Sequence, residues 1–152
     1  MRTAALEAAF RATTYRVTTA EASFGLRIGV ADPAFDAFLL RHAAAVPRPA
    51  AADRLPSRAD VCWGIVTAYN PGALLASAEN RVRQRRLQQR LIAGGWCFLS
   101  TGHFGDAGDW PEEPGYLILH AEEEQVRRLA SEFGQLAVVC GRTGSAPRMV
   151  WL

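Results

Sequence analysis

The sequence has few cysteines, no long apolar run and almost no net charge, and each absence excludes a class of protein. Its three cysteines form no CxxC pair and give no even set for a disulfide framework, so we expect buried, reduced thiols at Cys62, Cys97 and Cys140. No segment approaches the ~18 apolar residues that span a bilayer. Acidic and polar side chains soon follow the first residues, so we expect no signal peptide, which needs an uninterrupted apolar core. We therefore expect a cytoplasmic protein with no membrane association.

The charge balance limits the partners that the chain as a whole can attract. Seventeen basic residues against fifteen acidic residues give a formal net charge of +2. This balance excludes a general nucleic-acid coat and an electrostatic funnel for acidic substrates, so any basic function must be local. With 152 residues and 49% hydrophobic content, the chain is long enough for one domain with a real core and too short for two. We predict one globular domain over residues 1–152.

The hydrophobic patterns predict an α+β domain, a mixed sheet with helices packed on it, in the approximate order αββαβ-αββαββ. The unbroken apolar run at 61–66 is typical of a central strand covered on both faces. Three prolines among Ala, Arg and Asp predict a mobile Pro/Ala-rich loop at about 46–58. The expected elements are a short helix at 6–10, strands at 15–17 and 24–30, helices after Asp32 and at 77–93, strands at 96–100 and 116–120, a helix ending near Gly134, and strands at 136–140 and 148–152.

Polar side chains gather just beyond the central strand, where ligand sites often form in sheets covered by helices. Thr67 and Asn70 follow the strand, and Asn80 lies early in the next helix. If the two amides and the hydroxyl converge, they would need partners that a ligand can supply. The alternative is that Asn70, before Pro71 and Gly72, is ordinary turn chemistry.

The helix at 77–93 has two separate faces. At ~100° per residue, the side chains at 80, 84, 87 and 91 point inward and Arg83, Arg86 and Arg90 share another face. In one interpretation Ser77 caps the helix, Asn80 occupies the third position of a capping arrangement, and the arginines form a solvated face. In the other, Asn80 and the free helix N–H groups hold a polar or anionic ligand whose charge Arg83 balances.

Glu113 is the best candidate for acid/base chemistry, because Trp110 and the segment 114–116 surround it with apolar groups. The alternative is a surface glutamate or an acceptor for an N–H group. Gln135, just after the last helix, either reaches the same pocket or satisfies a carbonyl.

Metal ligation is not predicted. His103, Asp106 and Asp109 share a glycine-rich loop that we expect at 102–115, but no second histidine or cysteine completes a metal signature. The same loop lacks the Gly-Lys-Ser/Thr ending of a phosphate-binding loop. We therefore predict no metal and no cofactor.

Three motifs in this order carry a resemblance to a known family: TAYNPG with SAEN at 67–80, WPEEPGY at 110–116 and FGQLAV at 133–138. Together they resemble the bacterial family called domain of unknown function 3293, over roughly residues 15–150. The matching positions are Thr67, Asn70, Pro71, Ser77, Asn80, Trp110, Glu113 and Gln135. The chain departs from the family pattern at Gly115, where a small hydroxyl residue is usual, and at Leu136, where asparagine is frequent. The resemblance implies a single bacterial domain and no particular reaction.

The leading hypothesis is a site for a small polar or anionic molecule, with an enzymatic role left open. Its ligand-binding residues would be Thr67, Asn70, Asn80, Arg83, Trp110 and Gln135, and its catalytic residue would be Glu113. The alternative is a nucleic-acid or protein-binding module that uses the Arg-rich helix at 81–90, with Trp110 as a stacking surface. Convergence of Asn70, Asn80, Glu113 and Gln135 on one pocket would favour the first hypothesis.

Overall fold

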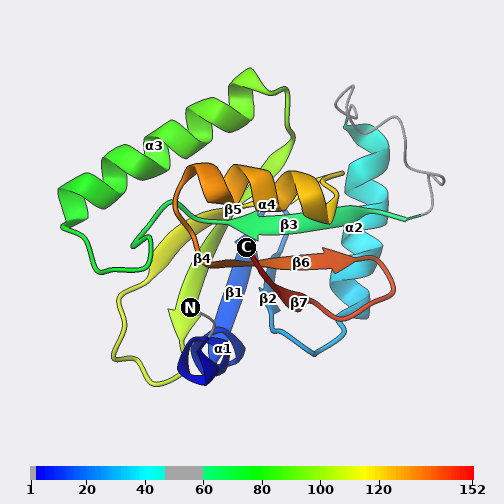
Figure 1. Cartoon of the computed structure of the whole chain (residues 1–152). Coiled ribbons are helices and arrows are strands. Elements are labelled where there is room, and N and C mark those ends of the chain that lie inside the picture. Colours follow the sequence, from blue (N-terminus) through cyan, green and yellow to red (C-terminus); the bar gives the residue numbers. More distant parts are fainter. Residues whose placement is uncertain (1–2, 47–59) are drawn as a thin grey trace.

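A computed structural model describes residues 3–46 and 60–152 and shows one curved sheet with helices on both sides (Figure 1). The predicted Pro/Ala-rich loop falls almost wholly on residues 47–59, outside the described residues. The element order is the predicted one, αββαβ followed by αββαββ. The helices are α1 (Ala4–Arg11), α2 (Pro33–Ala45), α3 (Ser77–Ala93) and α4 (Glu123–Glu132), and the strands are β1 (Thr13–Thr18), β2 (Ser23–Leu26), β3 (Cys62–Val66), β4 (Phe98–Gly105), β5 (Glu113–Leu119), β6 (Ala137–Arg142) and β7 (Arg148–Trp151).

The seven strands lie in the order β2-β1-β4-β5-β3-β6-β7, and every neighbouring pair is antiparallel. The α+β class is confirmed, but the sheet is not mixed as predicted. The reason is that the helical crossovers β3-α3-β4 and β5-α4-β6 each skip one strand position, and an antiparallel strand fills the gap. This arrangement of β3 to β6 is the split βαβ, or ferredoxin-like, unit.

The central strand β3 is buried on both faces, as its apolar run predicts. Trp63 and Ile65 face a core shared with α2, which includes Phe35 and Leu39. The opposite face packs against α3 and α4 in a second core built around Leu87, Leu91, Val126 and Leu129. Gly64 allows α4 to lie close to β3, because a Cβ there would be 2.4 Å from Val126 Cγ2. Both faces of β3 are thereby covered, and its carboxyl end leads directly into the polar segment.

Helix α3 has the inward face that its sequence predicts, since its buried residues are Asn80, Gln84, Leu87 and Leu91. The capping interpretation is wrong: Ala76 is the N-cap, and no side chain caps the helix. Asn80 instead bonds to the loop that precedes α3. Helix α2 begins as predicted, with the Asp32 side chain accepting a hydrogen bond from the Phe35 amide (2.9 Å).

Two of the three cysteines are buried as free thiols, and Cys97 is half-buried. Burial raises the pKa of Cys140 to about 12, which keeps this thiol protonated at neutral pH. Within residues 3–46 and 60–152, no helix has the length and apolar character needed to cross a membrane.

Candidate functional site

The segment at 67–75, which connects β3 to α3, forms a tightly bonded loop. The Thr67 hydroxyl donates to the Pro114 carbonyl (2.8 Å) and accepts from the Tyr69 amide (3.1 Å), which joins the loop to the start of β5. Asn70 has a φ of 45°, a left-handed conformation that asparagine tolerates better than most residues. The sequence signal Asn-Pro-Gly is therefore turn chemistry, but the Asn70 side chain has additional partners.

Asn70 in the loop and Asn80 on α3 are hydrogen-bonded to each other. Asn80 is 4% exposed. Its side-chain oxygen accepts a hydrogen bond from the main-chain N–H of Asn70 (2.9 Å), and its side-chain nitrogen donates to Asn70 Oδ1 (2.8 Å). Asn70 Oδ1 also accepts from the Leu75 amide (2.9 Å). Asn80 and the Leu75 amide together set the direction of the Asn70 side-chain amide.

The Glu113 carboxylate receives two hydrogen bonds on the same oxygen. Asn70 Nδ2 donates to Oε1 at 2.5 Å, and the Trp110 indole nitrogen donates to Oε1 at 2.9 Å. No hydrogen-bond donor among the described residues contacts the other oxygen, Oε2. The sequence suggested that Glu113 is a loop residue, but it is the first residue of β5. A strand end and two neutral donors therefore fix the carboxylate and leave one oxygen available.

Three further side chains fix the backbone of the loop. Arg83 donates to the Ala68 carbonyl (2.9 Å) and, through Nη2, to the Phe133 carbonyl. Gln135 donates to the Tyr69 carbonyl (3.0 Å), and Gln84, which sequence reasoning had not included in the site, accepts from the Ala68 amide (2.9 Å). The loop is tied to α3 on one side and to the end of α4 on the other.

A cavity of about 790 Å³ opens beside the loop. Five of the seven predicted site residues line it: Thr67, Asn70, Trp110, Glu113 and Gln135. Asn80 and Arg83 do not line the cavity and lie behind the loop, where they hold its shape. The remaining walls are mostly apolar and include Leu6, Phe10, Leu74, Leu136 and Val139.

A row of side chains across three strands forms the cavity floor, and sequence reasoning missed two of its members. Tyr15 on β1 is paired with His103 on β4, which is paired with Glu113 on β5. Tyr15 and His103 both line the cavity, and their rings meet edge to face at 4.9 Å. The sequence had suggested that His103 was a loop residue, but β4 extends to Gly105, so the predicted loop at 102–115 is shorter than expected.

Burial lowers the pKa of His103 to about 4, so the imidazole is neutral at pH 7. Its Nε2 lies 2.9 Å from Thr101 Oγ1. Burial also raises the pKa of Tyr15, so the phenol remains protonated. The row explains the glycine at position 115: a Cβ there would be 2.6 Å from His103 Nε2 and 2.8 Å from Thr101 Oγ1. In this chain the histidine occupies the space that a side chain at 115 would need.

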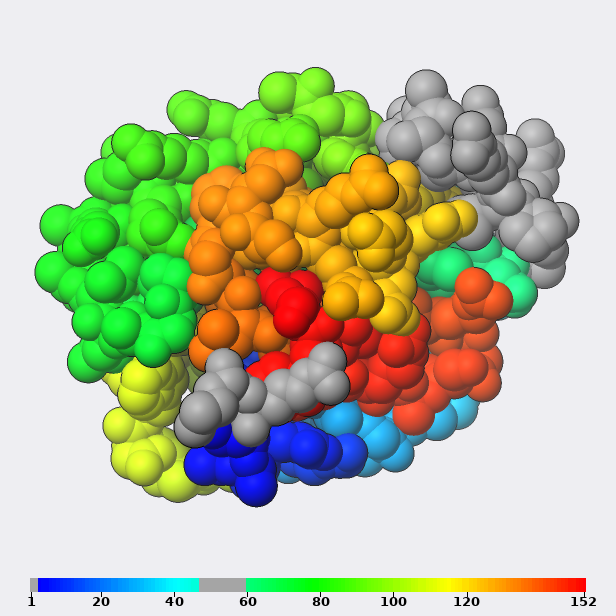
Figure 2. Space-filling model, in the orientation of Figure 1, coloured from blue at the N-terminus to red at the C-terminus, as the bar shows by residue number. Residues whose placement is uncertain are grey.

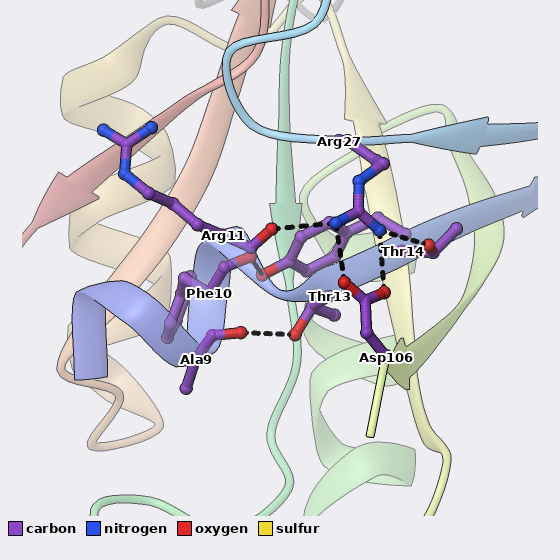
Figure 3. A network of polar contacts seen from close by, with 8 residues as sticks. Ala9, Phe10, Arg11, Thr13, Thr14, Arg27 and Asp106 are labelled. Carbon is purple, nitrogen blue, oxygen red and sulfur yellow. Dashed lines mark hydrogen bonds and ion pairs between the residues drawn. The ribbon is translucent and has the colours of Figure 1, made fainter. Parts of the chain in front are cut away.

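Helix α1 forms the far wall of the cavity and is held by a network around Arg27 (Figure 3). Arg27 makes two hydrogen bonds to Asp106 (2.8 and 2.7 Å), one to Thr14 Oγ1 (2.9 Å) and one to the Arg11 carbonyl (3.2 Å). The hydrogen bonds from Arg27 lower the pKa of Asp106. Figure 2 shows the loop between β4 and β5, in yellow-green, beside the blue α1, where the Asp106 amide donates to the Ala12 carbonyl (2.8 Å). The loop and the helix are therefore joined to each other, and both line the cavity.

Asp106 is thus paired with Arg27, and His103 belongs to the row with Tyr15 and Glu113. In the part of the chain that the structure describes, no three His, Cys, Asp or Glu side chains are grouped so that they could hold a metal ion.

The arginine face of α3 is divided among different partners. Arg83 bonds to two carbonyls, and Arg90 pairs with Glu132 (3.0 Å), whereas Arg86 is exposed. The three arginines that share one helical face in the sequence therefore do not present three free guanidinium groups.

Comparison with known proteins supports the resemblance found in the motifs. No curated protein and no solved structure matches the chain. A family model does match residues 66–138, just under half of the chain, and this range contains all seven predicted site residues. Over that range the chain resembles the family described as protein of unknown function (DUF3293), as its motifs predict.

Proposed function

We propose that this protein binds a small polar molecule in the cavity beside β3 and that Glu113 is the principal contact. The observation that supports this most directly is the presentation of the carboxylate. Two N–H groups hold Glu113 Oε1, from the loop after β3 and from the loop before β5, and Oε2 is left for a third partner. A carboxylate held in this way is preorganised, so a ligand does not need to order it on binding.

The neighbouring groups suit a polar ligand of small size. Thr67, Asn70 and Gln135 come from separate segments and reach the same cavity wall. Apolar side chains form most of the remaining lining, a combination typical of small-molecule sites. If a reaction takes place there, Glu113 is the group placed to transfer a proton and the amides are placed to orient the substrate.

The charges in the cavity argue against the anionic ligand that the sequence also allowed. Among the described lining residues, Asp106, Asp109 and Glu113 carry negative charge and no lysine or arginine is present. Arg83, the predicted partner of an anion, donates to two carbonyls outside the cavity. An anion would therefore meet repulsion and no basic partner.

The alternative function, nucleic-acid or protein binding through the helix at 81–90, now depends on Arg81, Arg85 and Arg86, which are exposed. A few exposed arginines on a chain of net charge +2 offer few phosphate contacts. Submicromolar binding of RNA or DNA that weakens steeply with salt would make this alternative the better account. We propose the small-molecule function as the primary one, in a bacterial cytoplasmic protein.

The proposed function predicts that Glu113→Gln weakens ligand retention by about tenfold or more, because the ligand loses a charged acceptor. Glutamine keeps an oxygen for Asn70 and Trp110, so the loop should keep its fold. The measurement is to purify the protein from a native-like lysate, denature it, and quantify the released small molecules by mass spectrometry.

The matched control is Glu112→Gln, the same chemical change one residue earlier, at an exposed position outside the cavity lining. Glu112→Gln and the wild type should release equal amounts of the same compound. Equal release by Glu113→Gln would remove Glu113 from the site. A wild-type protein that releases nothing and binds no member of a fragment library would contradict the proposed function itself.

A further inference from the structure

The charges of the cavity are of one sign, and one of them is already neutralised. Of the three carboxylates in the described lining, Asp106 is paired with Arg27. Asp109 and Glu113 remain, and the two groups that bond to Glu113 are neutral N–H donors. His103 carries no charge at neutral pH because burial lowers its pKa to about 4. The cavity is therefore net negative, and a cation would balance it.

An indole ring lies beside Glu113, and two tyrosines line the same cavity. Trp110 is 49% exposed, and its indole nitrogen bonds to Glu113, which fixes the ring next to the carboxylate. Tyr15 and Tyr69 also line the cavity. A carboxylate and aromatic rings in one cavity favour an ammonium group, because the rings attract a cation through their quadrupoles and the carboxylate attracts it through its charge.

Apolar side chains line much of the rest of the cavity. Leu74 is 67% exposed and Leu136 is 42% exposed, although both line the cavity. Leu6 and Phe10 from α1 face the same space. Exposed apolar side chains in a concave site gain free energy when a ligand covers them.

We infer that the cavity takes a small organic cation, an amine or quaternary ammonium compound with an apolar body. Its nitrogen lies against Glu113 and Trp110, and its apolar body lies against Leu74 and Leu136. This inference rests on the proposed function and adds the chemical class of the ligand. It names a positively charged head group, which the proposed function alone does not require.

The test uses three probes with the same six-carbon body and different head groups: hexylamine, hexanol and hexanoate. Isothermal titration calorimetry gives their affinities, and the indole N–H resonance of Trp110 reports where they bind. We expect hexylamine to bind about tenfold tighter than hexanol, and hexanoate to bind most weakly. The Trp110 resonance should shift with hexylamine.

Three variants separate the contributions of the head group and the body. Glu113→Gln should remove the preference for hexylamine over hexanol, whereas Glu112→Gln should keep it. Leu136→Asn should weaken hexylamine and hexanol by the same factor and leave the preference unchanged, because it changes only the apolar wall.

Two different failures are distinguishable. If hexanol or hexanoate binds as tightly as hexylamine, or if the lysate ligand is an anion that depends on Glu113, the inference about charge is overturned and the proposed function stands. If no probe binds and the purified protein retains no compound, both are overturned.

Discussion

Acidification from pH 7 to pH 4 should cost the native protein about 2–3 kcal/mol of unfolding free energy through His103 alone. Burial holds the folded-state pKa of this imidazole at about 4, below its ordinary value of 6.5. Below pH 6.5 the unfolded chain binds a proton that the folded protein does not, so acid favours unfolding. The contribution is fully present above pH 6.5 and is lost progressively as the pH falls towards 4, at about 1.4 kcal/mol per pH unit.

His103→Gln isolates this contribution, because glutamine does not titrate and still carries an amide to bond to Thr101. Carboxylates elsewhere also make stability depend on pH, so the informative quantity is the difference between wild type and variant. Urea unfolding at pH 7, 5.5 and 4 should show the wild type losing about 2–3 kcal/mol more than the variant. Parallel profiles would mean that the imidazole is protonated within the fold, and hence that it contacts water or a carboxylate.

The sequence predicts a feature of the fold where the apolar pattern of a single segment determines that feature. The inward face of α3 follows from the helical period alone, since the residues at 80, 84, 87 and 91 are four or three positions apart and all are buried. The apolar run of β3 similarly gave a strand buried on both faces. The pairing directions could not be obtained in this way, because the antiparallel sheet depends on which strand enters the gap left by each crossover.

The sequence predicted part of the cavity lining, but not the role of every residue. Thr67, Asn70, Glu113 and Gln135 do meet at one cavity. Asn80 and Arg83 had been expected to touch a ligand, but they bond to the loop instead. The shape of this loop depends on a left-handed conformation at Asn70, which no sequence periodicity indicates. Tyr15 and His103 were missed because their row runs across β1, β4 and β5, whose register is a property of the sheet.

The role of Asn80 as a positioning residue predicts a large stability effect. Asn80→Ala should lower the unfolding free energy by about 3 kcal/mol, because a buried polar group without a partner costs about 1–3 kcal/mol. Three groups each lose a hydrogen-bond partner: the Asn70 main-chain N–H (2.9 Å), Asn70 Oδ1 (2.8 Å) and the Leu75 carbonyl (3.3 Å). The control Arg86→Ala, on the exposed face of the same helix, should change it by about 0.5 kcal/mol or less. Denaturant midpoints compared at equal m-values give both numbers.

Asn80→Ala should also weaken hexylamine binding, although Asn80 does not line the cavity. Without Asn80, only the Leu75 amide holds Asn70 Oδ1, so the Asn70 side chain should hold the Glu113 carboxylate less firmly, and cation binding would have to order this acceptor. Arg86→Ala should bind hexylamine as the wild type does. Loss of stability with unchanged binding would show that Glu113 and Trp110 keep their geometry without the loop, and that Asn80 serves the fold alone.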